Sequence, residues 1–205
     1  ADAVEQAWAR GKGILFLTPH LGCFELSVQG AANLWSAEHG PITILYRPAK
    51  QAWLAEMMLT ARNRRGIQAV PTTLAGVRQM IKALRKGEAV GLLPDQVPPQ
   101  GQGQWAPFFG KDAYTMTLAA RLALQTGASV ILARCERLPA GRGYELFFEA
   151  LPMQLSAQLE DAVVQLNQAM EHTIQQCPTQ YLWGYGRYKQ PRQEAAVSAS
   201  EGGTA

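Results

Sequence analysis

The sequence predicts an α/β protein whose central sheet is layered, mostly parallel and flanked by helices. Short continuous apolar runs recur along the chain, as expected of strands covered on both faces. Stretches with helical periodicity separate these runs, and strand and helix alternate as they do in parallel sheets. The chain has 205 residues, of which 47% are hydrophobic and 17% charged. This length and composition suffice for one domain with a full core.

The elements follow one another in a regular order. The expected strands are residues 13–18, 42–46, 89–94, 129–135 and 144–151, the last pairing antiparallel with its predecessor through the turn PAGRG. The expected helices are residues 24–35, 53–64, 74–86, 115–126 and 156–176. The helix at 74–86 has the clearest signals, because Thr73 can cap its start, Ile81 and Leu84 continue an apolar stripe, and Gly87 ends it.

Composition also bounds the domain organisation and the compartment. Residues 1–190 are expected to form the single domain, and the small, polar, aperiodic residues 191–205 a disordered tail. The first 13 residues resemble the end of a helix leading into a strand, so we expect further sequence upstream. Three cysteines without pairing or metal-ligand spacing favour a reducing compartment and no structural metal. No run is long enough to span a bilayer, and the net charge of +3 is too small to argue for nucleic acid.

Polar residues follow three of the predicted strands. Ligands of open α/β sheets bind beyond the carboxyl ends of the strands, which places residues 18–20, 46–48 and 94–96 along one edge. His20 and Glu25 stand out there, because an imidazole can take a proton from a hydroxyl while a carboxylate orients it. The two are five positions apart and do not share a helix face, so His20 is expected in the turn before the helix that carries Glu25. A capping or core histidine and a solvated glutamate remain the alternative.

Other segments carry candidate binding residues. Arg47 ends a strand before a proline and suits a phosphate or carboxylate, or a surface ion pair. Arginines 62, 64 and 65 bind an anion or offset a helix dipole. Asp95 opens a proline- and glycine-rich loop that carries Trp105, Phe108 and Phe109, which form a lid, an apolar rim dipping into lipid, or a packed surface loop.

The stretch CPTQYLWGYGRYKQPR, here named the C-terminal arm (residues 177–192), interleaves aromatic and basic residues. Such a pattern suits single-stranded nucleic acid, an anionic membrane surface or an arm packed across the domain. No nucleic-acid-binding motif occurs elsewhere in the sequence, which argues against the nucleic-acid interpretation.

Six segments in order, GKGILFLTPHLGCFEL, LYRP, ARNRRG, GVRQMIKALRKGEAVGLLPDQ, APFFGKDAYTMTLAARLALQTGA and PTQYLWGYGRYKQPR, resemble the bacterial lipid A biosynthesis (late) acyltransferases. That family, of the lauroyl and myristoyl transferase type, belongs to the lysophospholipid acyltransferase-like enzymes and carries a histidine, four residues, then Asp or Glu. The resemblance implies a glycerolipid acyltransferase-like fold. It also implies transfer of an acyl chain from an acyl carrier protein thioester to a hydroxyl of a lipid A precursor, with no further cofactor and no metal.

By the same resemblance, His20 is the general base, Glu25 its orienting partner, and Arg47, Arg62, Asp95 and Gln96 substrate-binding residues. Asp95 is expected to position a cation or a sugar hydroxyl. The thioester is already activated, so a deprotonated alcohol and a stabilised oxyanion suffice without a covalent enzyme intermediate.

The resemblance further implies that the reaction takes place at the cytoplasmic face of the cell inner membrane. By itself, this chain is expected to be soluble or peripheral to that membrane. Family members usually begin with a hydrophobic membrane anchor, which this sequence lacks. Acyl transfer to another glycolipid, such as a phosphatidylinositol mannoside, is one alternative function. Thioester hydrolysis is another, and a non-enzymatic module that binds membrane or nucleic acid is the third.

Overall fold

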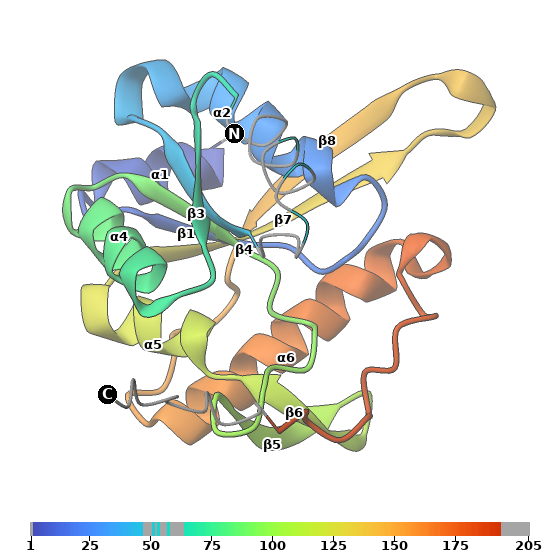
Figure 1. Ribbon diagram of the computed structural model, residues 1–205. Coiled ribbons are helices and arrows are strands. Elements are labelled where there is room, and N and C mark those ends of the chain that lie inside the picture. Colours follow the sequence, from blue (N-terminus) through green and yellow to red (C-terminus); the bar gives the residue numbers. More distant parts are fainter. Residues whose placement is uncertain (1, 47–50, 52, 54–56, 58–63, 194–205) are drawn as a thin grey trace, which may run out of the picture.

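The computed structural model describes residues 2–46, 51, 53, 57 and 64–193, and it confirms the α/β class (Figure 1). Six strands form one sheet in the order β3-β2-β4-β1-β7-β8. All neighbours are parallel except β8, which runs antiparallel to β7 as the sequence predicted. The strands are β1 (Ile14–Leu17), β2 (Ile42–Tyr46), β3 (Ile67–Pro71), β4 (Ala89–Leu92), β7 (Ser129–Arg137) and β8 (Tyr144–Ala150).

Helices cover both faces of this sheet. Helices α1 (Asp2–Ala9) and α2 (Phe24–His39) lie on one face, and α4 (Leu74–Arg85), α5 (Leu118–Thr126) and α6 (Leu159–Gln176) on the other. Strand β1 shows why its sequence is a continuous apolar run. Ile14 and Phe16 enter the core beneath α1 and α2, whereas Leu15 and Leu17 enter the larger core beneath α4, α5 and α6. None of the helices in the described ranges is long and apolar enough to span a bilayer.

The clearest helix begins and ends as its sequence indicated. The side chain of Thr73 accepts a hydrogen bond from the backbone N–H of Gly76 (3.3 Å), and the chain leaves the helix through Gly87 with a positive φ of 82°. Met80 and Leu84 point from this helix, α4, into the core. Two short 3₁₀ turns, η1 (Pro139–Gly141) and η2 (Pro178–Gln180), connect other elements.

The structure contains strands that the sequence did not predict. Strand β3 was not predicted, because IQAVP is short and follows the arginine-rich stretch. The expected helix at 115–126 begins at Leu118, because the preceding residues form β6 (Lys111–Met116), which pairs antiparallel with β5 (Gly103–Phe108). Phe109 and Gly110, both with positive φ, turn between these two strands as a tight hairpin requires. The expected helix at 53–64 falls largely outside the described residues.

The C-terminal arm crosses the carboxyl edge of the sheet. In Figure 1 it descends, in orange to red, from the end of α6 to the β5–β6 ribbon. Leu21 and Tyr181 form an isolated antiparallel bridge, and Gly22 donates a hydrogen bond to the carbonyl of Gln180 (2.9 Å). The arm therefore packs across the domain, which is one of the three readings that its sequence allowed.

Candidate active site

His20 lies in the loop that joins β1 to α2, at the carboxyl edge of the sheet. Its backbone N–H donates to Asp95 Oδ2 (2.9 Å), and its ring nitrogen Nδ1 lies 2.7 Å from Asp95 Oδ1. The side chain of His20 is 17% exposed and that of Asp95 only 2%. A buried carboxylate therefore holds both the backbone and the ring of a histidine that still reaches the surface.

This pairing follows from the register of two neighbouring strands. Leu17, the last residue of β1, lies opposite Leu92, the last residue of β4, and three residues beyond each strand the chain reaches His20 and Asp95. Because the strands are parallel, both side chains arrive at the same edge. The expectation that residues 18–20 and 94–96 converge is confirmed.

The contacts of His20 define its tautomer. A carboxylate accepts hydrogen bonds, so Nδ1 carries the proton and donates it to Asp95. The other ring nitrogen, Nε2, lies 3.1 Å from the amide nitrogen of Gln96, which donates to it. In this tautomer Nε2 has a lone pair, which accepts from Gln96, and a hydroxyl that displaced this amide would meet a general base.

The C-terminal arm completes the surroundings of Asp95. Tyr181 is 8% exposed, and its burial, together with its hydrogen bond to Asp95, raises its pKa above the ordinary range. The backbone N–H of Leu182 donates to the carbonyl of His20 (3.0 Å), and the N–H of Val97 donates to the hydroxyl of Tyr185 (2.9 Å). None of the three interpretations of this arm brought it to the site around His20. Its one signal in the sequence was the recurrence of tyrosine at positions 181, 185 and 188.

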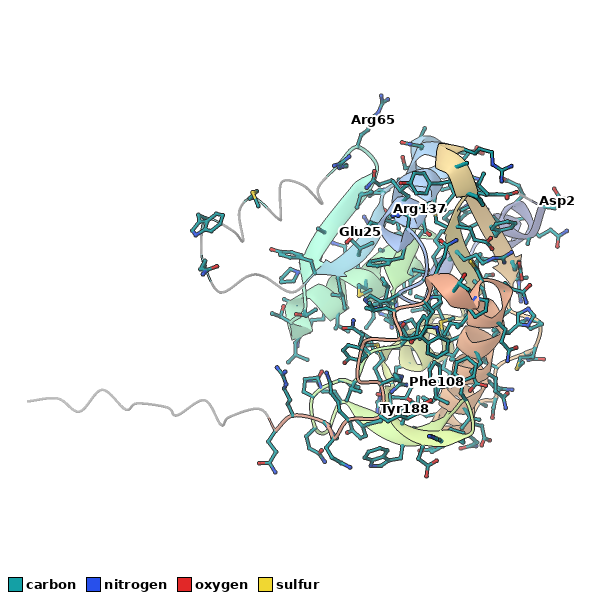
Figure 2. The ribbon with its side chains drawn as sticks, turned by 90° about the vertical axis from the view of Figure 1, so that its right-hand side faces the viewer. Asp2, Glu25, Arg65, Phe108, Arg137 and Tyr188 are labelled. Carbon is teal, nitrogen blue, oxygen red and sulfur yellow. The ribbon has the colours of Figure 1, made fainter. Side chains whose placement is uncertain are left out.

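Glu25 lies in the first turn of α2 with an exposed side chain, and Figure 2 shows it in the upper half of the view, above Phe108 and Tyr188. As expected, His20 precedes the helix that carries Glu25. The carboxylate at Nδ1 is, however, that of Asp95. The ring of Phe24 lies edge-on to the imidazole at 4.9 Å, so it limits the positions open to the ring. The orienting role of Glu25 stays a prediction.

The three aromatic residues expected to contact lipid occupy different environments. Trp105 is 47% exposed on β5, and Phe109 is partly buried at the hairpin turn. Phe108 is only 1% exposed and belongs to the core, where its ring lies under the guanidinium of Arg187. A contact with lipid therefore remains a prediction for Trp105 and Phe109, whereas the side chain of Phe108 is enclosed by protein.

Some expected site residues cannot be placed. Arg47 and Arg62 lie outside the described residues. Within the described part of the chain, no three histidine, cysteine or acidic side chains gather as metal ligands do. The thiols of Cys23, Cys135 and Cys177 are free.

Comparisons with known proteins agree with the sequence resemblance. A family profile described as bacterial lipid A biosynthesis acyltransferase matches residues 1–190. The chain is 30% identical to a lipid A biosynthesis lauroyltransferase of Escherichia coli over 192 residues, which cover 92% of this chain and 60% of that relative. It is 26% identical to a lipid A biosynthesis palmitoleoyltransferase of the same organism, with the same coverage. The chain thus spans about three fifths of the length of these relatives.

Proposed function

The chain belongs to the bacterial lipid A biosynthesis acyltransferase family, and from this premise we propose that it moves a fatty acyl chain from an acyl carrier protein thioester to a hydroxyl of a lipid A precursor. One observation carries the mechanism: the imidazole of His20 is held by a buried carboxylate at Nδ1 while Nε2 keeps its lone pair. Such a histidine is suited to deprotonate an alcohol.

The proposed reaction needs this base and a place for the oxyanion. Nε2 of His20 takes the proton of the acceptor hydroxyl as its oxygen attacks the thioester carbonyl. The tetrahedral oxyanion then collapses, the carbon–sulfur bond breaks, and the imidazolium returns the proton to the thiolate. The products are the ester and the free thiol of the carrier. Asp95 stabilises the imidazolium in between, because its carboxylate accepts a hydrogen bond from the Nδ1–H group throughout.

Gln96 has a defined part in this proposal. In the structure its amide donates to Nε2, which is the atom that the acceptor hydroxyl must approach. The incoming hydroxyl therefore displaces this amide, whose N–H groups then become available to the substrate. This supports the prediction that Gln96 binds substrate. Arg47 and Arg62 are proposed to bind anionic or sugar groups of the acceptor, and Glu25 to act as a second carboxylate beside the site.

The partners and the location belong to the same proposal. The relatives are named for lauroyl and palmitoleoyl transfer in lipid A biosynthesis, which supports a lipid acceptor and a long acyl chain. Such an acceptor resides in a membrane, so we place the reaction at the cytoplasmic face of the inner membrane with the chain at its surface. The exposed Trp105, Leu182 and Trp183 are compatible with lipid nearby.

The test is acyl transfer from lauroyl and palmitoleoyl carrier protein to a tetra-acylated lipid A precursor in mixed detergent micelles. We expect His20→Ala to lower kcat by about 10²–10⁴-fold, the usual contribution of a general base, and Asp95→Asn to lower it by a similar factor. His172→Ala is the matched control, because His172 is a 53% exposed histidine on α6. Wild-type rates in both His20→Ala and Asp95→Asn would contradict the mechanism.

Glu25→Gln separates the two carboxylates in the same assay. If Glu25 orients His20, its loss lowers kcat as strongly as the loss of Asp95. If Asp95 alone does so, Glu25→Gln changes KM more than kcat. Release of free fatty acid without acylated lipid would instead identify a thioesterase, and transfer only to a phosphatidylinositol mannoside would identify the other glycolipid acceptor.

A further inference from the structure

The loop that follows β4 (residues 93–102) carries two of the groups that contact the ring of His20. Asp95 Oδ1 lies 2.7 Å from Nδ1, and the side-chain amide of Gln96 lies 3.1 Å from Nε2. This loop lies beyond the paired part of β4, which ends at Leu92. Its position is therefore not fixed by strand pairing, and contacts with other segments must hold it.

The backbone of this loop has few donors by which it can be held. Pro98 and Pro99 have no N–H group, so Val97 carries the last backbone donor before the proline pair. That N–H donates to the hydroxyl of Tyr185 in the C-terminal arm (2.9 Å), 88 positions away in the sequence. The hydroxyl thus holds the backbone at the residue that follows Gln96.

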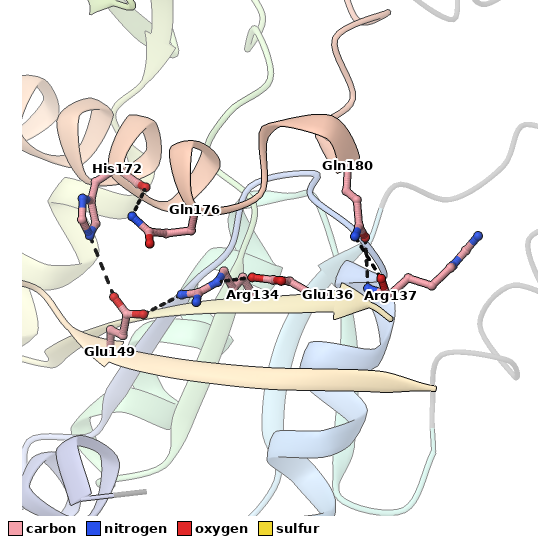
Figure 3. Close-up of polar contacts among 7 residues, drawn as sticks. All are labelled: Arg134, Glu136, Arg137, Glu149, His172, Gln176 and Gln180. Atoms are coloured by element: carbon pink, nitrogen blue, oxygen red, sulfur yellow. Dashed lines mark hydrogen bonds and ion pairs between the residues drawn. The ribbon is translucent and has the colours of Figure 1, made fainter. Parts of the chain in front are cut away.

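The arm that carries Tyr185 is itself anchored on both sides of this residue. Before it, the side-chain amide of Gln180 donates to the carbonyl of Arg137 at the end of β7 (3.0 Å) and accepts from the N–H of the same residue (3.0 Å) (Figure 3). After it, Arg187 is 4% exposed, and its guanidinium donates to the carbonyl of Tyr114 in β6 (2.8 Å). Because the arm is fixed at both points, the hydroxyl of Tyr185 is a firm support for the loop after β4.

We propose that Tyr185 is a positioning residue for acyl transfer, and that its hydroxyl keeps the loop of Asp95 in place against the ring of His20. This inference rests on the proposed function. The same arm also holds the other side of the pair, since the N–H of Leu182 donates to the carbonyl of His20 (3.0 Å). One segment therefore ties the base and its carboxylate to a common frame. Such geometry matters for the rate, because a misplacement of about 1 Å can cost about a hundredfold.

The first test compares the free protein by NMR in wild type and Tyr185→Phe. This substitution removes the hydroxyl alone, because it keeps the ring over which the ammonium of Lys189 lies at 4.1 Å. We expect solvent exchange of the Val97 amide to become at least about tenfold faster, since the amide loses its acceptor. We also expect the nuclear Overhauser contacts between the side-chain amide of Gln96 and the ring of His20 to weaken.

Tyr188→Phe is the matched control. Tyr188 belongs to the same arm, and its hydroxyl donates to the carbonyl of Phe108 in the β5–β6 ribbon (2.8 Å). The same deletion is therefore made at a hydroxyl that is bonded to the ribbon and not to the loop after β4. We expect the Val97 amide and the contacts of Gln96 in this variant to match those of wild type. Thermal unfolding establishes that both variants are folded at the temperature of the measurements.

Acyl transfer is the second test. Tyr185→Phe is expected to lower kcat by about 10–100-fold. We expect little change in KM, because a misplaced base weakens the transition state more than it weakens substrate binding. Tyr188→Phe is expected to keep the wild-type kcat. An equal loss of kcat in both variants would show a general effect of the arm on the fold and would overturn the proposal.

A double-mutant cycle tests whether Tyr185 acts through the carboxylate of Asp95. Groups that work as a unit give losses that do not add. In the Asp95→Asn background, Tyr185→Phe is therefore expected to lower kcat by much less than in wild type. Losses that multiply in full would overturn a role through Asp95.

The NMR comparison also separates this proposal from the proposed function, because it needs no substrate. Unchanged exchange of the Val97 amide and unchanged contacts between Gln96 and His20 in Tyr185→Phe would show that water replaces the hydroxyl, and would overturn the proposal. A wild-type chain without transferase activity would contradict the proposed function, while the same spectra still decide whether Tyr185 holds the loop.

Discussion

Gly22 offers the sharpest test of how the fold places the base. It lies two residues after His20, with a positive φ of 57°, in a bridge to Cys135 of β7. A Cβ at this position would lie 2.1 Å from the carbonyl oxygen of Cys135. That oxygen is backbone within a paired strand, so it cannot swing aside as a flexible side chain would. Gly22→Ala must therefore displace the loop that carries His20.

The size of the effect follows from a comparison with Gly11. Gly11 has a similar φ of 65°, but nothing lies within 4 Å of its Cβ position. Gly11→Ala is expected to lower the free energy of unfolding by about 1–2 kcal/mol, the strain of the left-handed conformation. Gly22→Ala adds a steric conflict that typically costs about 1–3 kcal/mol. The unfolded-state effect of replacing glycine is the same in both variants and cancels.

The assay is urea unfolding of both variants, followed by circular dichroism, together with acyl transfer. Gly22→Ala is expected to be the less stable variant by about 1–3 kcal/mol. It is also expected to lose at least about tenfold in kcat, since displacement of His20 from Asp95 misaligns the base. Gly11→Ala is expected to keep wild-type activity. Equal stabilities of the two variants, or full activity of Gly22→Ala, would refute this account of the loop.

Two further predictions concern buried polar groups elsewhere in the fold. Burial, aided by the negative charges of Cys23 and Glu136, raises the pKa of the Cys135 thiol to about 11. The folded state therefore keeps a proton that the unfolded state releases near pH 9, so stability is fully present below that pH and falls as pH rises towards 11, by about 2–3 kcal/mol. Urea unfolding between pH 9 and 11 should show that the free energy of unfolding falls with pH in wild type and falls less steeply in Cys135→Ala. Equal pH dependence in the two proteins would contradict the prediction. Asn167 of α6 is 3% exposed and donates to the carbonyl of Pro107 (2.8 Å) and the hydroxyl of Thr115 (3.1 Å). Asn167→Ala removes the donor to the Pro107 carbonyl and should lower the free energy of unfolding by about 1–3 kcal/mol, measured by the same method. A loss below about 0.5 kcal/mol would show that water replaces the amide.

The sequence predicted the parts of the fold that depend on local pattern. Runs such as ILFL and SVILAR are buried on both faces, as expected of strands in a parallel sheet that helices cover on both sides. The β5–β6 ribbon was missed because its strands include polar and proline residues and its turn is made by Phe109 and Gly110 rather than by a common turn pair. The local composition of residues 103–116 therefore does not predict the β5–β6 ribbon.

The candidate site was predicted in part for the same reason. His20 and Asp95 were both singled out at strand ends, but their pairing depends on β1 and β4 being neighbours, and strand order is a property of the whole sheet. Glu25 attracted attention because it is close in sequence, whereas Asp95 lies 75 positions away and bonds to the ring. Spacing along the chain reports helix and turn geometry. It carries no information about which distant strand end arrives at the same edge.

The C-terminal arm shows how one composition supports different interpretations. Interleaved aromatic and basic residues suit nucleic acid, membrane or internal packing, and the pattern alone does not choose among them. In the structure Tyr181 and Arg187 turn inward to Asp95 and β6, whereas Leu182 and Trp183 remain exposed. The inward residues tie the arm to Asp95 and to the β5–β6 ribbon, whereas the outward ones leave apolar surface exposed. A segment whose composition suits a binding surface therefore also serves as internal support for the loop that carries His20.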